Sequence, residues 1–186
     1  SREPSHLTLS EDAFKQIFSP KLTSPDFFDL LKSFRTISEA IDGHTEDRFC
    51  EWFELPDLEK IDLHTFSQSV PRDLFTCKPL DYTFLDLYHH IQSIYVKLKK
   101  QKHFHVYTGP LSSPLNSFIC LKRNVGVIVI KSGVDPIYFA FNHPIMLHAF
   151  EHFIEDMTSL AFNDVHLKSQ TLKALECWLA QAESLI

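Results

Sequence analysis

The hydrophobic pattern of this chain changes its period after about residue 79, and that change constrains the fold more than any other feature. Before it, apolar residues recur every three to four positions, as on one face of an amphipathic helix. After it, one long helical pattern is followed by short apolar runs with a period of two or without a polar break. We therefore expect an α+β fold, with a helical N-terminal segment packed on a small antiparallel sheet of about four strands flanked by helices.

The expected helices rest on caps and stop signals as well as on spacing. Ser10 and Ser24 are good N-cap residues, and Gly43 is placed to stop the second helix. The expected helices are 10–18, 24–43, one that begins at Thr45 and carries Phe49, Trp52 and Phe53, 80–101, one from Asn142 to about residue 160, and 164–185.

Four short segments in the second half of the chain predict strands, and these are 103–107, 118–121, 127–130 and 137–141. Their connections are short, which requires antiparallel neighbours, because a parallel crossover needs a dozen residues or more. The second and third runs should be central strands. We therefore expect these six residues to be nearly inaccessible: Phe118, Ile119, Val127, Ile128, Val129 and Ile130.

The change of period also predicts the domain organisation. We expect a helical segment over 1–78 and an α+β module over 79–186, with 71–79 as the connector between them. This connector is too short and too apolar for a flexible tether, so the two parts should pack as one unit. The chain begins with Ser1 and not with Met, so we expect either a part of a longer protein or a processed chain.

Composition excludes several classes of function. The formal net charge of −6 argues against nucleic-acid binding, and the lysines near residue 100 fall at the end of an expected helix, where cations complement the helix dipole. With only four glycines, the chain has neither a G-x-G-x-x-G nor a Walker-type loop. It contains no apolar run long enough to cross a membrane. Four widely spaced cysteines favour a reducing, cytoplasmic location over a disulfide framework.

One short motif could carry chemistry. His148, Glu151 and His152 fit H-x-x-E-H, the motif of the inverzincin metallopeptidases. On a helix the two histidines share a face and could bind zinc, with Glu151 as general base toward a metal-bound water. A third ligand would be needed, and nothing in the sequence selects one. The alternative is a solvated helix face opposite Phe150 and Phe153.

A second group of polar residues lies on the first expected strand. His103, His105 and Tyr107 alternate, so they share one face and could line a polar ligand pocket. His89 and His90, late in the preceding helix, are expected nearby. The alternative is an exposed polar strand face without a ligand.

These observations favour a non-enzymatic intracellular regulatory module of a larger protein, a ligand-sensing or dimerisation domain such as those of transcription regulators. A small-molecule or protein partner and a homodimer are expected, without a cofactor, direct nucleic-acid binding or a membrane. The last helix carries an apolar band wider than one packing surface, which is a common basis for a symmetric dimer. The first eighty residues could equally cover it. Two alternatives stay open: a zinc-dependent hydrolase that uses the H-x-x-E-H helix, and a structural protein-interaction module.

Overall fold

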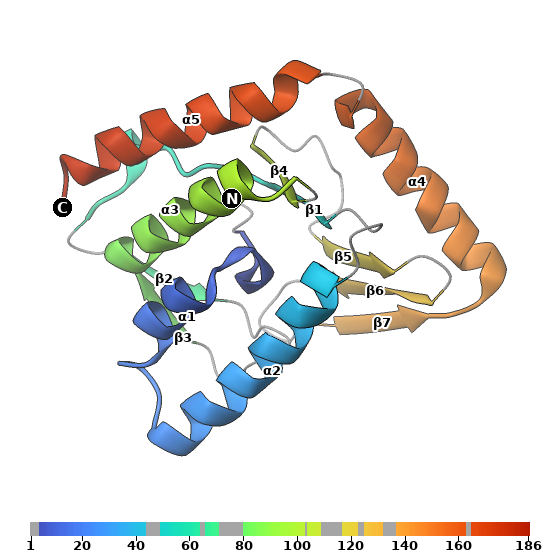
Figure 1. Ribbon diagram of the computed structural model, residues 1–186, viewed down its shortest axis with the longest axis horizontal. Helices are drawn as coiled ribbons and strands as arrows, with labels where there is room; N and C mark the ends of the chain where they lie inside the picture. The colour runs from blue at the N-terminus through green and yellow to red at the C-terminus, as the bar shows by residue number, and fades with distance from the viewer. Residues whose placement is uncertain are drawn as a thin grey trace. The chain divides into compact units, whose positions relative to one another are not determined.

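The computed structural model describes residues 4–43, 49–63, 66–70, 80–102, 104–108, 117–122, 125–131, 137–162 and 165–186 (Figure 1). The chain divides into two compact units. Unit 1 comprises residues 1–111 and 168–186, and unit 2 comprises residues 112–167. The expected connector 71–79 lies outside the described residues, so a boundary there stays a prediction. The fold is α+β, as expected.

The first two expected helices are present in unit 1. After a short 3-10 turn at His6–Thr8, helix α1 spans Glu11–Phe18 and helix α2 spans Ser24–Gly43. The Ser10 hydroxyl caps α1 by accepting a hydrogen bond from the Ala13 backbone N–H at 3.3 Å. The buried rings of Phe14 and Phe34 stack with centroids 4.2 Å apart, which fastens α1 to α2.

The helix expected to begin at Thr45 is wrong where the chain is described. Residues Phe49–Phe53 form strand β1, which pairs in parallel with strand β4, Phe104–Thr108. Aromatic residues also suit a strand, and Phe53 is fully buried at its end. The long connection between the two strands satisfies the length that a parallel crossover needs. Pairing with a distant strand has therefore decided the structure of residues 49–53, whose spacing of aromatic residues had predicted a helix.

That crossover contains a second strand pair and the central helix of unit 1. Beyond a 3-10 turn at Leu58–Lys60, strand β2 (Ser67–Val70) pairs antiparallel with β3 (Leu80–Thr83). Helix α3 then spans Phe84–Lys100, so the long expected helix starts four residues later than predicted. Thr83 and Asp86 form a reciprocal capping box, which sets this start.

Unit 2 contains the meander. Strands β5 (Ser117–Lys122), β6 (Gly126–Lys131) and β7 (Ile137–Phe141) form an antiparallel sheet in that order, followed by helix α4 (Pro144–Phe162). The expected four-stranded sheet is therefore wrong, since the sheets of the described residues have two, two and three strands. The first expected strand pairs with β1 instead, because a strand pattern does not specify its partner.

The meander is also less buried than expected. Val127 is 1% exposed, but Ile119, Ile128 and Val129 are half-buried; the side chains of Phe118 and Ile130 lie outside the description. Within unit 2 the rings of Phe141 and Phe150 stack with their centroids 6.2 Å apart. This contact places α4 against the face of the sheet that carries Phe141. One helix covers only one face of a sheet, so residues of this meander stay partly accessible.

Helix α5 spans Val165–Glu183, and from residue 168 onward it belongs to unit 1. Leu175 and Ala182 are fully buried, and Trp178 is 6% exposed with its Nε1–H donating to the Pro56 carbonyl at 2.9 Å. The apolar band expected to form a dimer is thus largely covered by unit 1 itself, as the alternative reading held. Leu185 and Ile186 remain exposed.

The core of unit 1 lies among these helices and strand β4. Its fully buried large side chains are Leu9, Phe14, Ile17, Phe18, Phe34, Phe53, Leu87, Ile91, Ile94, Leu98, Phe104 and Leu175. Among the helices described, none has a segment both long and apolar enough to cross a bilayer.

Candidate functional site

The most completely connected polar cluster in unit 1 centres on His90 of α3, which is buried and bonded through both ring nitrogens. Its Nε2 lies 2.8 Å from the Thr8 Oγ1, and its Nδ1 lies 2.9 Å from the Tyr82 hydroxyl. The Thr8 hydroxyl donates its own hydrogen to the Ser5 carbonyl at 2.6 Å. Thr8 must therefore accept from His90 Nε2–H, which leaves Nδ1 to accept from Tyr82. This network assigns the neutral Nε2–H tautomer.

The environment of His90 keeps the imidazole neutral. Burial lowers the pKa of His90 well below its ordinary 6.5, and the electrostatic effects of His6 and Lys97 act in the same direction. A hydrogen bond with the Ser5 backbone opposes them. His6 itself is buried, with its ring edge-on to Phe18 at 4.9 Å between centroids.

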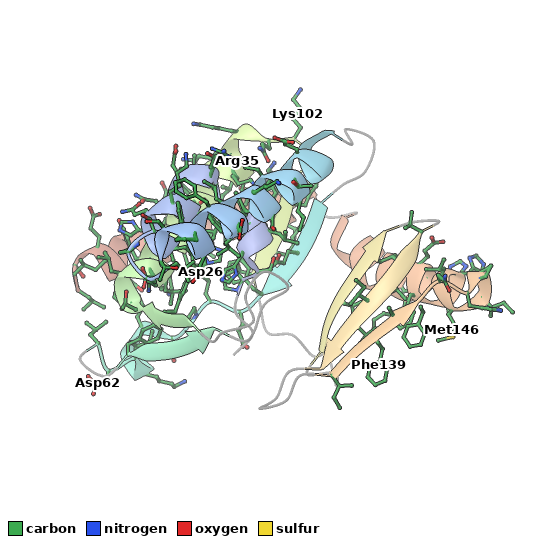
Figure 2. All side chains as sticks on the ribbon, turned by 90° about the horizontal axis from the view of Figure 1, so that it is seen from below. Asp26, Arg35, Asp62, Lys102, Phe139 and Met146 are labelled. Carbon is green, nitrogen blue, oxygen red and sulfur yellow. The ribbon has the colours of Figure 1, made fainter. Side chains whose placement is uncertain are left out.

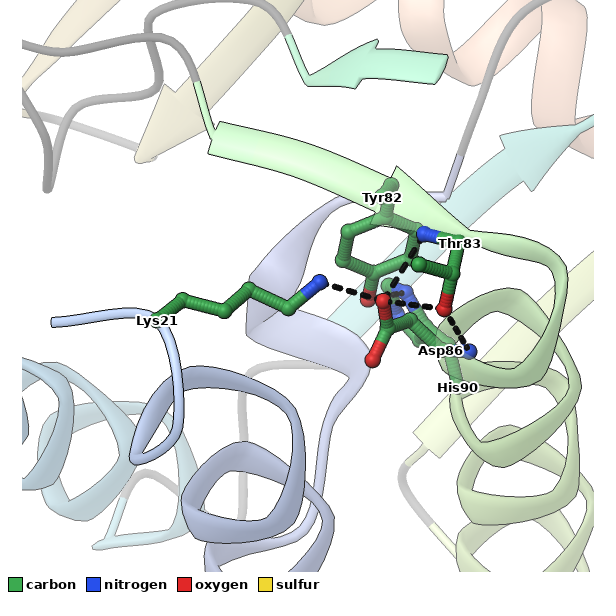
Figure 3. A network of polar contacts seen from close by, with 5 residues as sticks. All are labelled: Lys21, Tyr82, Thr83, Asp86 and His90. Atoms are coloured by element: carbon green, nitrogen blue, oxygen red, sulfur yellow. Dashed lines mark hydrogen bonds and ion pairs between the residues drawn. The ribbon is translucent and has the colours of Figure 1, made fainter. Parts of the chain in front are cut away.

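A charged group lies beside this network (Figure 3). Asp86 accepts from the Thr83 backbone N–H at 2.8 Å and from its hydroxyl at 2.6 Å, and it forms an ion pair with Lys21. Figure 3 shows Lys21 reaching across from the segment after α1 toward Asp86 at the start of α3. A carboxylate in the first turn also complements the dipole of that helix.

Together these contacts hold the N-terminal segment against the rest of unit 1. Ser5 donates to Glu51, and the Ser10 backbone N–H donates to the Ser93 hydroxyl at 2.7 Å. The donors and acceptors of His90 are consumed within the network, so we interpret it as a structural anchor and not as a reaction centre. The sequence did hold a signal for it, since His90 falls three residues after Leu87 and four before Ile94 on the apolar stripe of α3.

The group expected to line a ligand pocket is only partly described. On β4, His105 is half-buried and Tyr107 is buried, with their rings nearly parallel and 6.4 Å apart. His103 lies outside the described residues. The two described side chains therefore do share one face, as alternation predicted.

A surface pocket of about 360 Å³ lies elsewhere in unit 1. Its lining combines an apolar floor with three charged residues and consists of Glu54, Leu55, Pro56, Asp57, Lys60, Ile61 and Phe66. The Lys60 ammonium donates to Asp57 at 2.8 Å, and this bond lowers the pKa of the exposed Asp57 carboxyl. No motif in the sequence marks this pocket.

The H-x-x-E-H residues lie on α4, as expected. His148 and His152 are exposed, and their Nε2 atoms lie 3.1 Å apart. Glu151 is half-buried. Among the residues that the structure describes, no third histidine, cysteine or carboxylate joins the pair to form a metal-binding group.

The remaining feature is the outer strand of unit 2. Among the described strands β7 pairs only with β6, so no described strand occupies its other edge, and its sequence Ile-Tyr-Phe-Ala-Phe carries no charge. Ile137 is 51% and Phe139 is 47% exposed, although both share the face that carries Phe141. Figure 2 shows Phe139 on β7 and Met146 on α4, both exposed parts of unit 2. An uncharged open edge of this kind is a template for pairing with another strand.

No protein-family model matches the chain, and neither does any curated protein or solved structure.

Proposed function

We propose that this chain is a non-enzymatic regulatory module that works by dimerising, and that two copies join along strand β7. The observation that carries the proposal is the uncharged open edge of β7 with Ile137 and Phe139 exposed beside it. Natural sheets usually protect an edge with charge, proline or a bulge. No charge or proline occurs in β7.

A second copy of the same strand fits this edge best. Two β7 strands running antiparallel across a two-fold axis would satisfy each other's backbone N–H and C=O groups and extend two three-stranded sheets into one of six. Ile137 and Phe139 of each copy would gain cross-strand partners. The opposite edge strand, β5, is less suited, because its sequence ends in Lys122 and edge lysines oppose pairing.

Sedimentation of the full chain tests the dimer. We expect a species of twice the 21.6 kDa chain mass at micromolar concentration. Phe139→Lys should give a folded monomer. Pairing would remove water from the lysine charge and so oppose the dimer, whereas the same charge on the exposed strand of a monomer costs little free energy. The matched control is Phe28→Lys on α2, an equally drastic change at a residue that is 65% exposed in unit 1, and it should leave the dimer intact. A monomeric wild-type chain, or a dimer that survives Phe139→Lys, would contradict the proposal.

The regulatory input that we propose is a small molecule bound to unit 1. The surface pocket beside Ile61 has the size of an ordinary ligand site, since such sites span about 300–1,000 Å³. A thermal-shift screen of metabolites with the wild-type chain tests this idea. Any stabilising compound should lose its effect in Ile61→Arg, which fills the pocket, and keep it in His105→Ala. The reverse result would assign the ligand to the strand face of His105 and Tyr107.

A further inference from the structure

We propose that His148 and His152 form a surface chelate for one divalent transition-metal ion. This inference goes beyond the proposed function and does not depend on the dimer. It concerns binding alone and makes no use of Glu151 as a base. The site is formed by one turn of α4, between two residues that the structure places side by side.

The geometry of the pair matches the bite of a metal ion. The two Nε2 atoms are 3.1 Å apart, and their ring centroids are 4.3 Å apart with an angle of 66° between the rings. Zinc binds imidazole nitrogen at about 2.0–2.1 Å, so one ion bonded to both nitrogens would subtend an angle of about 100° between them. This angle is close to the tetrahedral value of about 109° that zinc prefers.

The accessibility of the pair also suits a metal. Both histidines are exposed, so an ion can reach them without local unfolding and can keep water in its other coordination positions. Their helical spacing of four residues holds both rings on one face before the ion arrives, which reduces the entropy lost on binding. To bind the ion, the ring that now donates in the Nε2···Nε2 hydrogen bond would move its proton from Nε2 to Nδ1, so that both Nε2 lone pairs are available to the metal.

The ligand set defines the class of metal. Imidazole nitrogen favours Zn²⁺, Ni²⁺ and Cu²⁺ over the hard cations Mg²⁺ and Ca²⁺, which prefer oxygen ligands. Because no third ligand joins the pair among the described residues, the protein supplies two positions. Such an open site is expected to bind less tightly than a closed structural zinc site.

Isothermal titration of the full chain with ZnCl₂ tests the site. We expect saturable binding that Mg²⁺ does not reproduce, and a loss of affinity of at least about tenfold in His148→Gln and in His152→Gln, since each removes one of two protein ligands. His143→Gln is the matched control, because it removes an exposed histidine that precedes the same helix. It should leave the affinity unchanged.

Two further measurements decide what the binding means. Addition of paramagnetic Cu²⁺ should broaden the NMR signals of α4 residues near 148 and 152 before those of unit 1. Glu151→Gln should bind zinc as the wild type does. Zinc affinity that is equal in the wild type and both histidine variants would overturn the proposal, as would broadening confined to unit 1. A tenfold loss in Glu151→Gln would overturn the two-histidine ligand set.

Discussion

Thr8 and His90 are 82 positions apart in the chain, yet the Thr8 Oγ1 lies 2.8 Å from the His90 Nε2 in the interior of unit 1. Thr8 passes the chain of hydrogen bonds on to the Ser5 carbonyl, and His90 continues it to the Tyr82 hydroxyl. The segment before α1 is thereby tied to α3 and β3.

Replacing Thr8 by Val should destabilise the protein by about 1–3 kcal/mol, because a buried N–H of His90 loses its acceptor while the side-chain volume is kept. Urea denaturation measures the change. Thr36→Val on α2 is the matched control, since Thr36 is exposed and its hydroxyl donates to the Lys32 carbonyl of its own helix at 3.0 Å. That control should shift stability by less than about 0.5 kcal/mol. Equal effects in the two variants would show that the buried bond contributes nothing.

The stability of unit 1 should fall as the pH drops below 6.5. Burial lowers the pKa of His90 in the folded state, so below 6.5 the unfolded chain binds a proton that the folded chain does not. Above pH 6.5 this difference in proton binding costs no stability. Each pH unit below 6.5 lowers the free energy of unfolding by up to about 1.4 kcal/mol, until the pH reaches the pKa of His90 in the folded state. The slope of unfolding free energy against pH should be shallower in His90→Gln, whatever its absolute stability.

Phe14 should be among the most sensitive positions of the core. Its side chain is fully buried between Phe18 and Phe34, with ring centroids 4.7 and 4.2 Å away. Phe14→Ala should cost about 3–5 kcal/mol, through lost transfer free energy and the cavity left behind. Phe28→Ala on the exposed side of α2 should change stability by less than about 0.5 kcal/mol. A chemical-denaturation midpoint that barely moves in Phe14→Ala would contradict the packing of α1 on α2.

The Glu11 carboxyl should titrate at unusually low pH. Hydrogen bonds from Arg35 and Lys15 lower its pKa from 4.5 to about 2, with Arg35 donating through both Nε and Nη2. Any stability from this pair is present above pH 4.5 and is lost as the pH falls toward 2. Carbon-detected NMR titration should show that the titration midpoint of Glu11 rises in Arg35→Ala, because two hydrogen bonds to the carboxylate are lost. The midpoint should also rise in about 1 M salt, because salt screens an exposed ion pair. A midpoint that stays low in Arg35→Ala would assign the shift to another cause.

Local patterns predicted most of the helices well. The caps at Ser10 and the spacing along α2, α3, α4 and α5 are properties of neighbouring residues, so they can be read without knowing what lies opposite. The alternation of His105 and Tyr107 and the helical spacing of His148 and His152 are of the same kind. In each case the side chains that the pattern placed on one face do lie on one face.

Partners could not be predicted in this way. Phe49–Phe53, expected in a helix, forms a strand because it pairs with β4. Phe104–Thr108, expected in the antiparallel meander, takes part in this parallel pair instead. The wide apolar band of α5 is largely covered by unit 1, where the Trp178 Nε1–H donates to the Pro56 carbonyl, while Leu185 and Ile186 stay exposed. His90 was expected only as one of two histidines late in its helix, and no local pattern indicated Thr8 as its hydrogen-bond acceptor.

The sequence by itself determined where most helices begin and end, that the class is α+β, and which side chains share a helix or strand face, because these depend on residues a few positions apart. Only the tertiary structure decided which strands pair, which apolar faces are covered, and which polar groups satisfy His90. Those outcomes depend on contacts between residues such as Thr8 and His90, or Pro56 and Trp178, that lie far apart in the chain. Hydrophobic burial is non-directional, so a pattern shows that a face must be covered without showing what covers it.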